Sequence, residues 1–186
     1  MMKSKTIILL LAAAGIWGHS DAQHHASESH KAGENVATQL KAPAAMVVEH
    51  KEIHKMLDDA TQLPGKTGEA AQALLKVMGP HFIKEEEYAL PPLGILPLLA
   101  EGKALSGADR KSAIAMTDKL KADLPGMLQD HKMVVLSLNA LVEAAEADNH
   151  PEVIEFAKKL KLHAETEEEV SYPAAILVGK YLKLKH

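Results

Sequence analysis

Residues 81–87 of the chain read HFIKEEE, and residues 163–169 read HAETEEE. In both stretches a histidine is followed, four residues later, by the first of three consecutive glutamates. Residues four apart lie on the same face of an α-helix, so His81 and Glu85 can reach one point, as can His163 and Glu167. Each stretch therefore predicts a helix that presents one imidazole and one carboxylate to the same place.

A lone histidine precedes each stretch at nearly the same distance. His50 lies 31 residues before His81, and His131 lies 32 residues before His163. These four histidines, with Glu85 and Glu167, fall within apolar stripes of helical period. Any one of them alone could be a satisfied core histidine or a glutamate of a solvated face. Burying all six is costly unless they are paired or bound to metal, so together they predict a dinuclear site.

The chain around these residues divides into four expected helices. The sequence predicts an all-α fold, an up-down-up-down four-helix bundle over 42–186 with a metal site in the bundle core. Phe156, Leu160 and Val170 are expected on the inner face of the last helix, and Pro173 should bend or end it. The expected ranges are 43–63, 67–91 and 108–147 with an interruption at 124–126, then 151 onward with a further apolar stretch to 186.

Composition narrows the class of protein. The chain has 186 residues, which suits a single domain, and no Cys, which excludes disulfides, thiolate zinc sites and iron–sulfur clusters. A formal net charge of -4 offers no field that would attract nucleic acid. Aromatic residues make up only 3%, which favours helices over sheets. Because the chain has no Cys, a metal would have to be bound by histidines and carboxylates.

The N-terminal segment is typical of a secretory signal peptide. Two lysines within the first five residues precede an apolar run, and Ser20-Asp21-Ala22 places small residues at a cleavage position. We expect a signal peptide over 1–22, cut after Ala22, and hence a periplasmic or secreted protein with no membrane contact; an uncleaved anchor is the alternative. Residues 23–41 are expected to form a disordered linker, although His24, His25 and His30 could instead capture metal weakly.

The four-helix pattern resembles the hemerythrin-like, HHE cation-binding family. The resemblance spans 42–183 and is carried by residues 49–53, 81–91, 131–132 and 163–169. Ferritin-like di-iron bundles use Glu-x-x-His instead, with a spacing of three. The resemblance implies that Glu85 and Glu167 bridge two oxo-bridged, non-haem Fe ions. It makes His50, His81, His131 and His163 terminal ligands.

This chain departs from the oxygen-carrying hemerythrins in two places. Their second histidine on the third helix is replaced here by Val135, and their last acidic ligand lies one residue further from its histidine than Glu167 does. His54, on the first helix, could supply a fifth imidazole or could simply be half-buried beside the site. Reversible oxygen carriage is therefore not transferred from the resemblance.

Three functional classes stay open at this point. The preferred one is a binding protein that takes dioxygen or nitric oxide for sensing, storage or protection. The second is a di-iron oxidase or peroxidase-type enzyme, for which Tyr88 is the candidate proton donor unless it only packs in the core. The third is a buffering protein that holds Zn or mononuclear Fe; Zn or Mn could also occupy the dinuclear site. The oligomeric state is left open.

Overall fold

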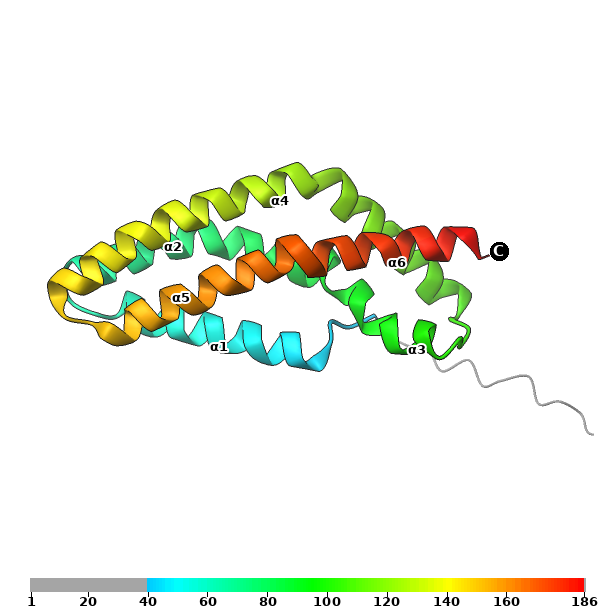
Figure 1. Cartoon of the computed structure of the whole chain (residues 1–186), viewed down its shortest axis with the longest axis horizontal. Helices are drawn as coiled ribbons and strands as arrows, with labels where there is room; N and C mark the ends of the chain where they lie inside the picture. Colours follow the sequence, from blue (N-terminus) through cyan, green and yellow to red (C-terminus); the bar gives the residue numbers. More distant parts are fainter. Residues whose placement is uncertain (1–39, 186) are drawn as a thin grey trace, which may run out of the picture. The chain divides into compact units, whose positions relative to one another are not determined.

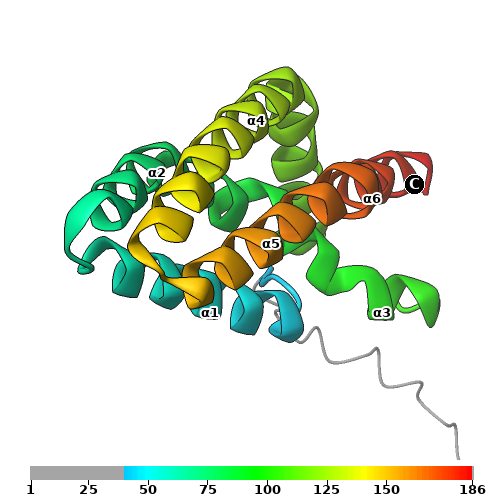
Figure 2. The ribbon, with the colours of Figure 1, turned by 60° about the vertical axis from the view of Figure 1, so that its left-hand side comes forward.

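Four helices pack in a closed ring in the computed structural model, which describes residues 40–185. The predicted all-α four-helix bundle is confirmed, and each helix packs on its two neighbours in the order α1, α2, α4, α5 (Figures 1 and 2). The predicted signal peptide and nearly all of the predicted linker, with its three histidines, lie outside the described residues. The bundle helices are α1 (Ala44–Thr61), α2 (Gly65–Lys84), α4 (Gly107–Asp148) and α5 (Pro151–Thr166).

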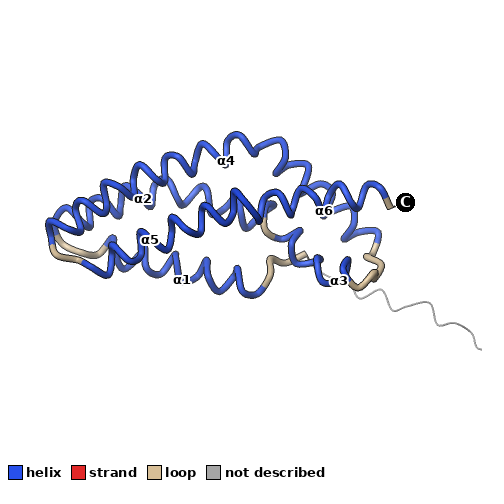
Figure 3. Tube along the Cα trace, in the orientation of Figure 1, coloured by secondary structure: helices blue, strands red, loops and turns tan. Residues whose placement is uncertain are grey.

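Short turns join the helices in antiparallel pairs. Gly65, with φ +80°, follows the turn between α1 and α2, and Asn149, with φ 61°, ends α4 in the left-handed conformation before Pro151 begins α5. The longer connection from α2 to α4 runs through η1 (Glu85–Ala89), η2 (Pro91–Ile95) and α3 (Leu96–Ala100). Figure 3 shows only helices and loops over residues 40–185.

The interruption predicted at 124–126 is wrong. α4 runs without a break through Pro125, and α2 likewise continues through Pro80. Proline removes one backbone hydrogen bond and bends a helix, but packing on neighbouring helices holds the remaining bonds. α4 packs on α2 and α5 and also on α6 (Tyr172–Leu184), and its ribbon changes direction along its length (Figure 1).

The predicted inner position of Val170 is also wrong, because a π-helical turn intervenes. Residues Glu167–Ser171 form η3, and the backbone N–H of Tyr172 donates to the carbonyl oxygen of Glu167, five residues earlier. The extra residue in this turn rotates the following side chains around the helix axis. Val170 is consequently 59% exposed and Tyr172 is fully buried. Pro173 lies in the first turn of α6, where proline is tolerated.

Two of the three apolar clusters that the described residues form in the core have a polar layer between them. One cluster gathers residues such as Ile53, Phe82 and Leu160, and the other gathers residues such as Leu90 and Tyr172. The buried histidines lie in α1, α2, α4 and α5, and the buried glutamates begin η1 and η3, where the two clusters meet. The bundle therefore encloses a polar layer that only paired or metal-bound groups could make stable.

Among the helices of residues 40–185, none combines the length and the apolar composition that a membrane span requires.

Candidate metal centre

The structure brings the six sequence-predicted residues His50, His81, Glu85, His131, His163 and Glu167 together in the bundle core. α1 supplies His50, α2 and η1 supply His81 and Glu85, α4 supplies His131, and α5 and η3 supply His163 and Glu167. Each of the six is at most 4% exposed. They form two groups of four that share both glutamates, and in each group the ligand atoms lie within 4.8 Å of one another.

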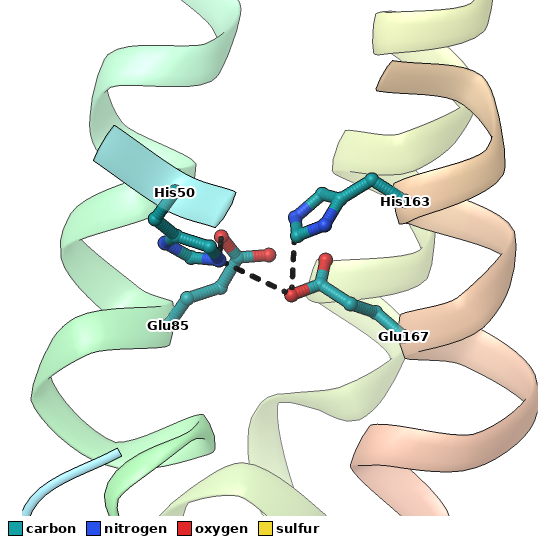
Figure 4. A group of neighbouring side chains, drawn as sticks. All are labelled: His50, Glu85, His163 and Glu167. Atoms are coloured by element: carbon teal, nitrogen blue, oxygen red, sulfur yellow. Dashed lines mark ion pairs between the residues drawn. The ribbon is translucent and has the colours of Figure 1, made fainter. Parts of the chain in front are cut away.

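Group 1 consists of His50, Glu85, His163 and Glu167 (Figure 4). Nε2 of His50 lies 3.8 Å from Oε2 of Glu85 and 3.7 Å from Oε1 of Glu167. Nε2 of His163 lies 3.4 Å from the same Oε1 of Glu167. The side chains converge from three sides, and their donor atoms are too far apart for strong hydrogen bonds but close enough to surround an ion.

Group 2 consists of His81, Glu85, His131 and Glu167. Nε2 of His81 lies 2.7 Å from Oε1 of Glu85, and Nε2 of His131 lies 3.5 Å from Oε2 of Glu167. The two Nε2 atoms are 2.8 Å apart. Two imidazoles and two carboxylates thus converge again, from α2, η1, α4 and η3.

Each of the two carboxylates turns one oxygen toward each group. Glu85 turns Oε2 toward group 1 and Oε1 toward group 2, whereas Glu167 turns Oε1 toward group 1 and Oε2 toward group 2. A carboxylate with one oxygen at each of two positions is a bridging ligand when both positions hold a metal. The anionic bridges also reduce the repulsion between two cations held close together.

Within residues 40–185, four buried side-chain nitrogen or oxygen atoms have no hydrogen-bond partner, and all four belong to group 1. They are Nε2 of His50, Oε2 of Glu85, Nε2 of His163 and Oε1 of Glu167. Leaving a polar atom unsatisfied in a core costs about 1–3 kcal/mol, more when it is charged. Imidazole nitrogen and carboxylate oxygen are donors that suit Fe, Mn and Zn. A bound cation would satisfy all four atoms at once, so the donor set fits a metal ion.

A carboxylate faces the second ring nitrogen of every histidine in the site. Nδ1 of His131 lies 2.9 Å from Glu168, and Nδ1 of His50 lies 3.9 Å from Glu86. These partners are the middle glutamates of the two EEE runs.

The other two histidines are paired across the bundle. Nδ1 of His163 lies 3.5 Å from Glu49, and Nδ1 of His81 lies 3.4 Å from Asp130. Each acid directly precedes, in the sequence, the lone histidine of the same group. Such outer carboxylates fix the ring orientation and make the metal-facing nitrogen more basic.

Without a metal, a proton on His131 balances part of the negative charge of the buried carboxylates. Burial opposes charging of the His131 ring, but Glu167, Glu85 and Glu168 outweigh it and raise the pKa of His131 to about 10. Burial also opposes ionisation of Glu85, yet the imidazoles of His131 and His81 that face it keep the pKa of Glu85 well below its ordinary value. Protonated imidazole therefore stands beside ionised carboxylate where a metal would supply the positive charge.

A π-helical turn begins at each of the two shared glutamates. η1 begins at Glu85 and η3 begins at Glu167, and the N–H of Leu90 closes η1 by donating to the carbonyl oxygen of Glu85 at 2.9 Å. π-helical turns inside α-helices occur frequently at functional sites. A π-helical turn thus begins at the first glutamate of the EEE run in both HxxxEEE stretches.

Tyr172 is the residue of the site that the sequence analysis missed. Its hydroxyl donates to Oε1 of Glu85 at 2.8 Å, whereas the hydroxyl of Tyr88, the candidate considered there, donates to Asp123 at 2.6 Å, away from both groups. Tyr172 lies five residues after Glu167, a spacing that reaches the same face only through a π-helical turn. Besides the HxxxEEE stretches, the repeated proline at Pro91 and Pro173 is a sequence signal that aligns Tyr172 with Leu90.

His54 lies outside both groups. Its side chain is 40% exposed, its ring lies 3.9 Å from that of Phe82, and Nε2 is 3.8 Å from Oε1 of Glu86. The structure therefore brings His54 beside the outer carboxylate of His50 and not to either metal position. Glu86 and Glu87 are mostly exposed, as their places in the helix predict.

Comparison of the chain with protein-family models, with curated proteins and with solved structures finds no match. The geometry alone thus establishes a buried His/Glu site that is able to bind metal, with two overlapping groups that could each hold an ion.

Proposed function

We propose that the protein is a hemerythrin-like, non-haem di-iron protein that binds dioxygen or nitric oxide for sensing, storage or protection. Two oxo-bridged Fe ions would occupy group 1 and group 2, with Glu85 and Glu167 as bridges and the four histidines as terminal ligands. The signal peptide expected over 1–22 would place the protein in the periplasm or outside the cell.

One observation carries this proposal. Each of the two buried carboxylates turns one oxygen to each group, and each group is completed by two histidines. A structural core needs no such division of oxygens, whereas a dinuclear centre does. The orphaned atoms of group 1 are further support, because a cation is the partner that they share.

The ligand count supports a role in binding small molecules. Each ion would receive two imidazole nitrogens and two bridging carboxylate oxygens from the six residues. Iron in mixed nitrogen and oxygen sites commonly takes further ligands, so positions are left for an exogenous molecule. Zn or Mn fit the same donors, and the preference for iron comes from the resemblance to the hemerythrin-like family.

The optical spectrum tests the proposal. Protein purified without an added His tag should contain two Fe per chain and show an oxo-to-iron absorption band. The band should change on reduction and change again on exposure to dioxygen or nitric oxide. A colourless protein with zinc bound would instead favour the buffering role, since zinc has no such band.

A second candidate function is a di-iron oxidase or peroxidase-type reaction. The hydroxyl of Tyr172 favours it, because this group lies among the buried donors and could deliver a proton at the centre. Multiple turnovers with hydrogen peroxide and an electron donor would support the enzyme. A single stoichiometric reaction with no turnover would support the binding protein.

A further inference from the structure

The two halves of the centre differ in chemistry at one buried position next to the shared glutamates. Leu90 and Tyr172 each follow nine residues after the histidine of an HxxxEEE stretch, and each precedes a proline. Each N–H closes a π-helical turn onto the carbonyl oxygen of a shared glutamate. Both side chains are buried, but Leu90 is apolar and Tyr172 carries a hydroxyl.

The hydroxyl of Tyr172 lies among all four donor atoms of group 2. Its oxygen is 2.8 Å from Oε1 of Glu85 and 3.3 Å from Oε2 of Glu167. It is also 3.5 Å from Nε2 of His81 and 3.4 Å from Nε2 of His131. The donors of group 2 thus contact this oxygen, while the corresponding donors of group 1 lack hydrogen-bond partners.

We propose that the phenol oxygen of Tyr172 is a fifth protein ligand of the ion in group 2. This inference rests on the proposed dinuclear metal site and adds a residue to it. This oxygen lies within 3.5 Å of four ligand atoms, so an ion that those atoms bind would lie next to it. A phenolate also adds negative charge, which suits a trivalent cation.

The coordination step balances without a redox partner. The O–H bond of Tyr172 breaks, its proton leaves to water, and the oxygen lone pair forms the bond to the metal. No electron is transferred. The positive charge of the bound ion favours the ionised oxygen of a coordinated hydroxyl.

Coordination by Tyr172 makes the two ions unlike. The ion in group 2 gains a protein oxygen, while the ion in group 1 has only Leu90 at the equivalent place. A pocket of about 410 Å³, with Met46, Val47 and Leu90 in its wall, reaches His50 on this side. Exogenous molecules are therefore expected to bind the ion in group 1.

Ionised tyrosine has its own near-ultraviolet absorption, which provides a test that does not depend on activity. The chain has three tyrosines, Tyr88, Tyr172 and Tyr181. Adding zinc ions to metal-free protein near neutral pH should ionise one tyrosine in the wild type and in Y88F and Y181F. Y172F should show no ionised tyrosine. Ferric protein should also show a phenolate-to-iron visible band that Y172F lacks.

The outcomes separate this inference from the proposed function. Two bound ions with no ionised tyrosine in the wild type would overturn ligation by Tyr172 and leave the dinuclear site standing. Absence of bound metal would overturn both. Should Y172F fail to fold, retention of the signal in both Y88F and Y181F would still assign it to Tyr172 by elimination. Loss of the signal in Y88F or Y181F would contradict the assignment.

Discussion

Oε1 of Glu168 lies 2.9 Å from Nδ1 of His131, while Nε2 of the same ring faces Glu167 at 3.5 Å. The imidazole is therefore held between a carboxylate outside the site and a carboxylate within it. This arrangement fixes the ring with its Nε2 toward group 2 and makes that nitrogen a better metal donor.

Glu168→Gln should weaken metal binding, because the amide neither carries the charge nor accepts the His131 N–H as strongly. The expected loss is about 10–100-fold in affinity, the usual effect of removing such an outer partner. Competition titration with a coloured chelator measures it. Glu169→Gln is the matched control, since Glu169 is the next residue and is exposed. Equal affinities for the two variants would argue against the role of Glu168.

Glu85→Ala should remove metal and destabilise the bundle. One side chain is lost from both groups, and the histidines that face it are left without their buried counter-charge. Breaking a buried ion pair in this way costs about 3–5 kcal/mol. Denaturant unfolding and metal analysis measure the two effects, with Glu87→Ala as the exposed control. A metal-replete Glu85→Ala protein with an unchanged spectrum would refute the bridging role.

His54→Ala should leave the metal content unchanged. The ring of His54 contacts Phe82 and Glu86 and does not belong to either group. Metal analysis of the variant should therefore give the same number of ions per chain as the wild type. Loss of one ion would restore His54 as a fifth imidazole ligand.

Stability of the metal-free protein should depend on pH in a defined direction. The pKa of His131 rises from 6.5 to about 10 on folding. Protonated His131 therefore contributes fully to the free energy of unfolding below pH 6.5, and this contribution is lost as the pH rises toward 10. The pKa of Glu85 falls below 4.5, so its contribution is complete above that value and is lost in acid. The stability maximum is expected between these limits.

Thermal unfolding in the presence of a chelator, across pH 4 to 10, tests this dependence. The midpoint should be highest at about pH 5–6.5 and should fall steadily above that range. Adding zinc should reduce the fall on the alkaline side, because a bound ion replaces the proton of His131. A metal-free midpoint that stays constant from pH 6 to 10 would contradict the proposed charge arrangement.

The sequence was sufficient to predict the four helices and the convergence of the six site residues. Spacing of four in a helix and apolar stripes of period 3.6 are local properties, and the repeat between His50 to Glu85 and His131 to Glu167 made coincidence a poor explanation. The ring of packed helices in the structure follows from those same stripes.

What the sequence could not predict depends on departures from the regular period. The π-helical turns at Glu85 and Glu167 rotate the following residues, so Tyr172 points inward and Val170 outward. The pairing of Glu49 with His163 joins two helices that are distant in sequence, and no local pattern indicates it. Pro125 similarly predicted a break that tertiary packing overrides.

Counting the metal ions in a single chain tests the central claim most directly. Native mass spectrometry of the purified protein, with Glu85→Gln measured in parallel, resolves chains that carry no ion, one ion or two. Sharing of Glu85 and Glu167 predicts two ions in the wild type and loss of both in Glu85→Gln. A wild-type chain that holds only one ion, or a variant that keeps both, would contradict the shared-carboxylate centre.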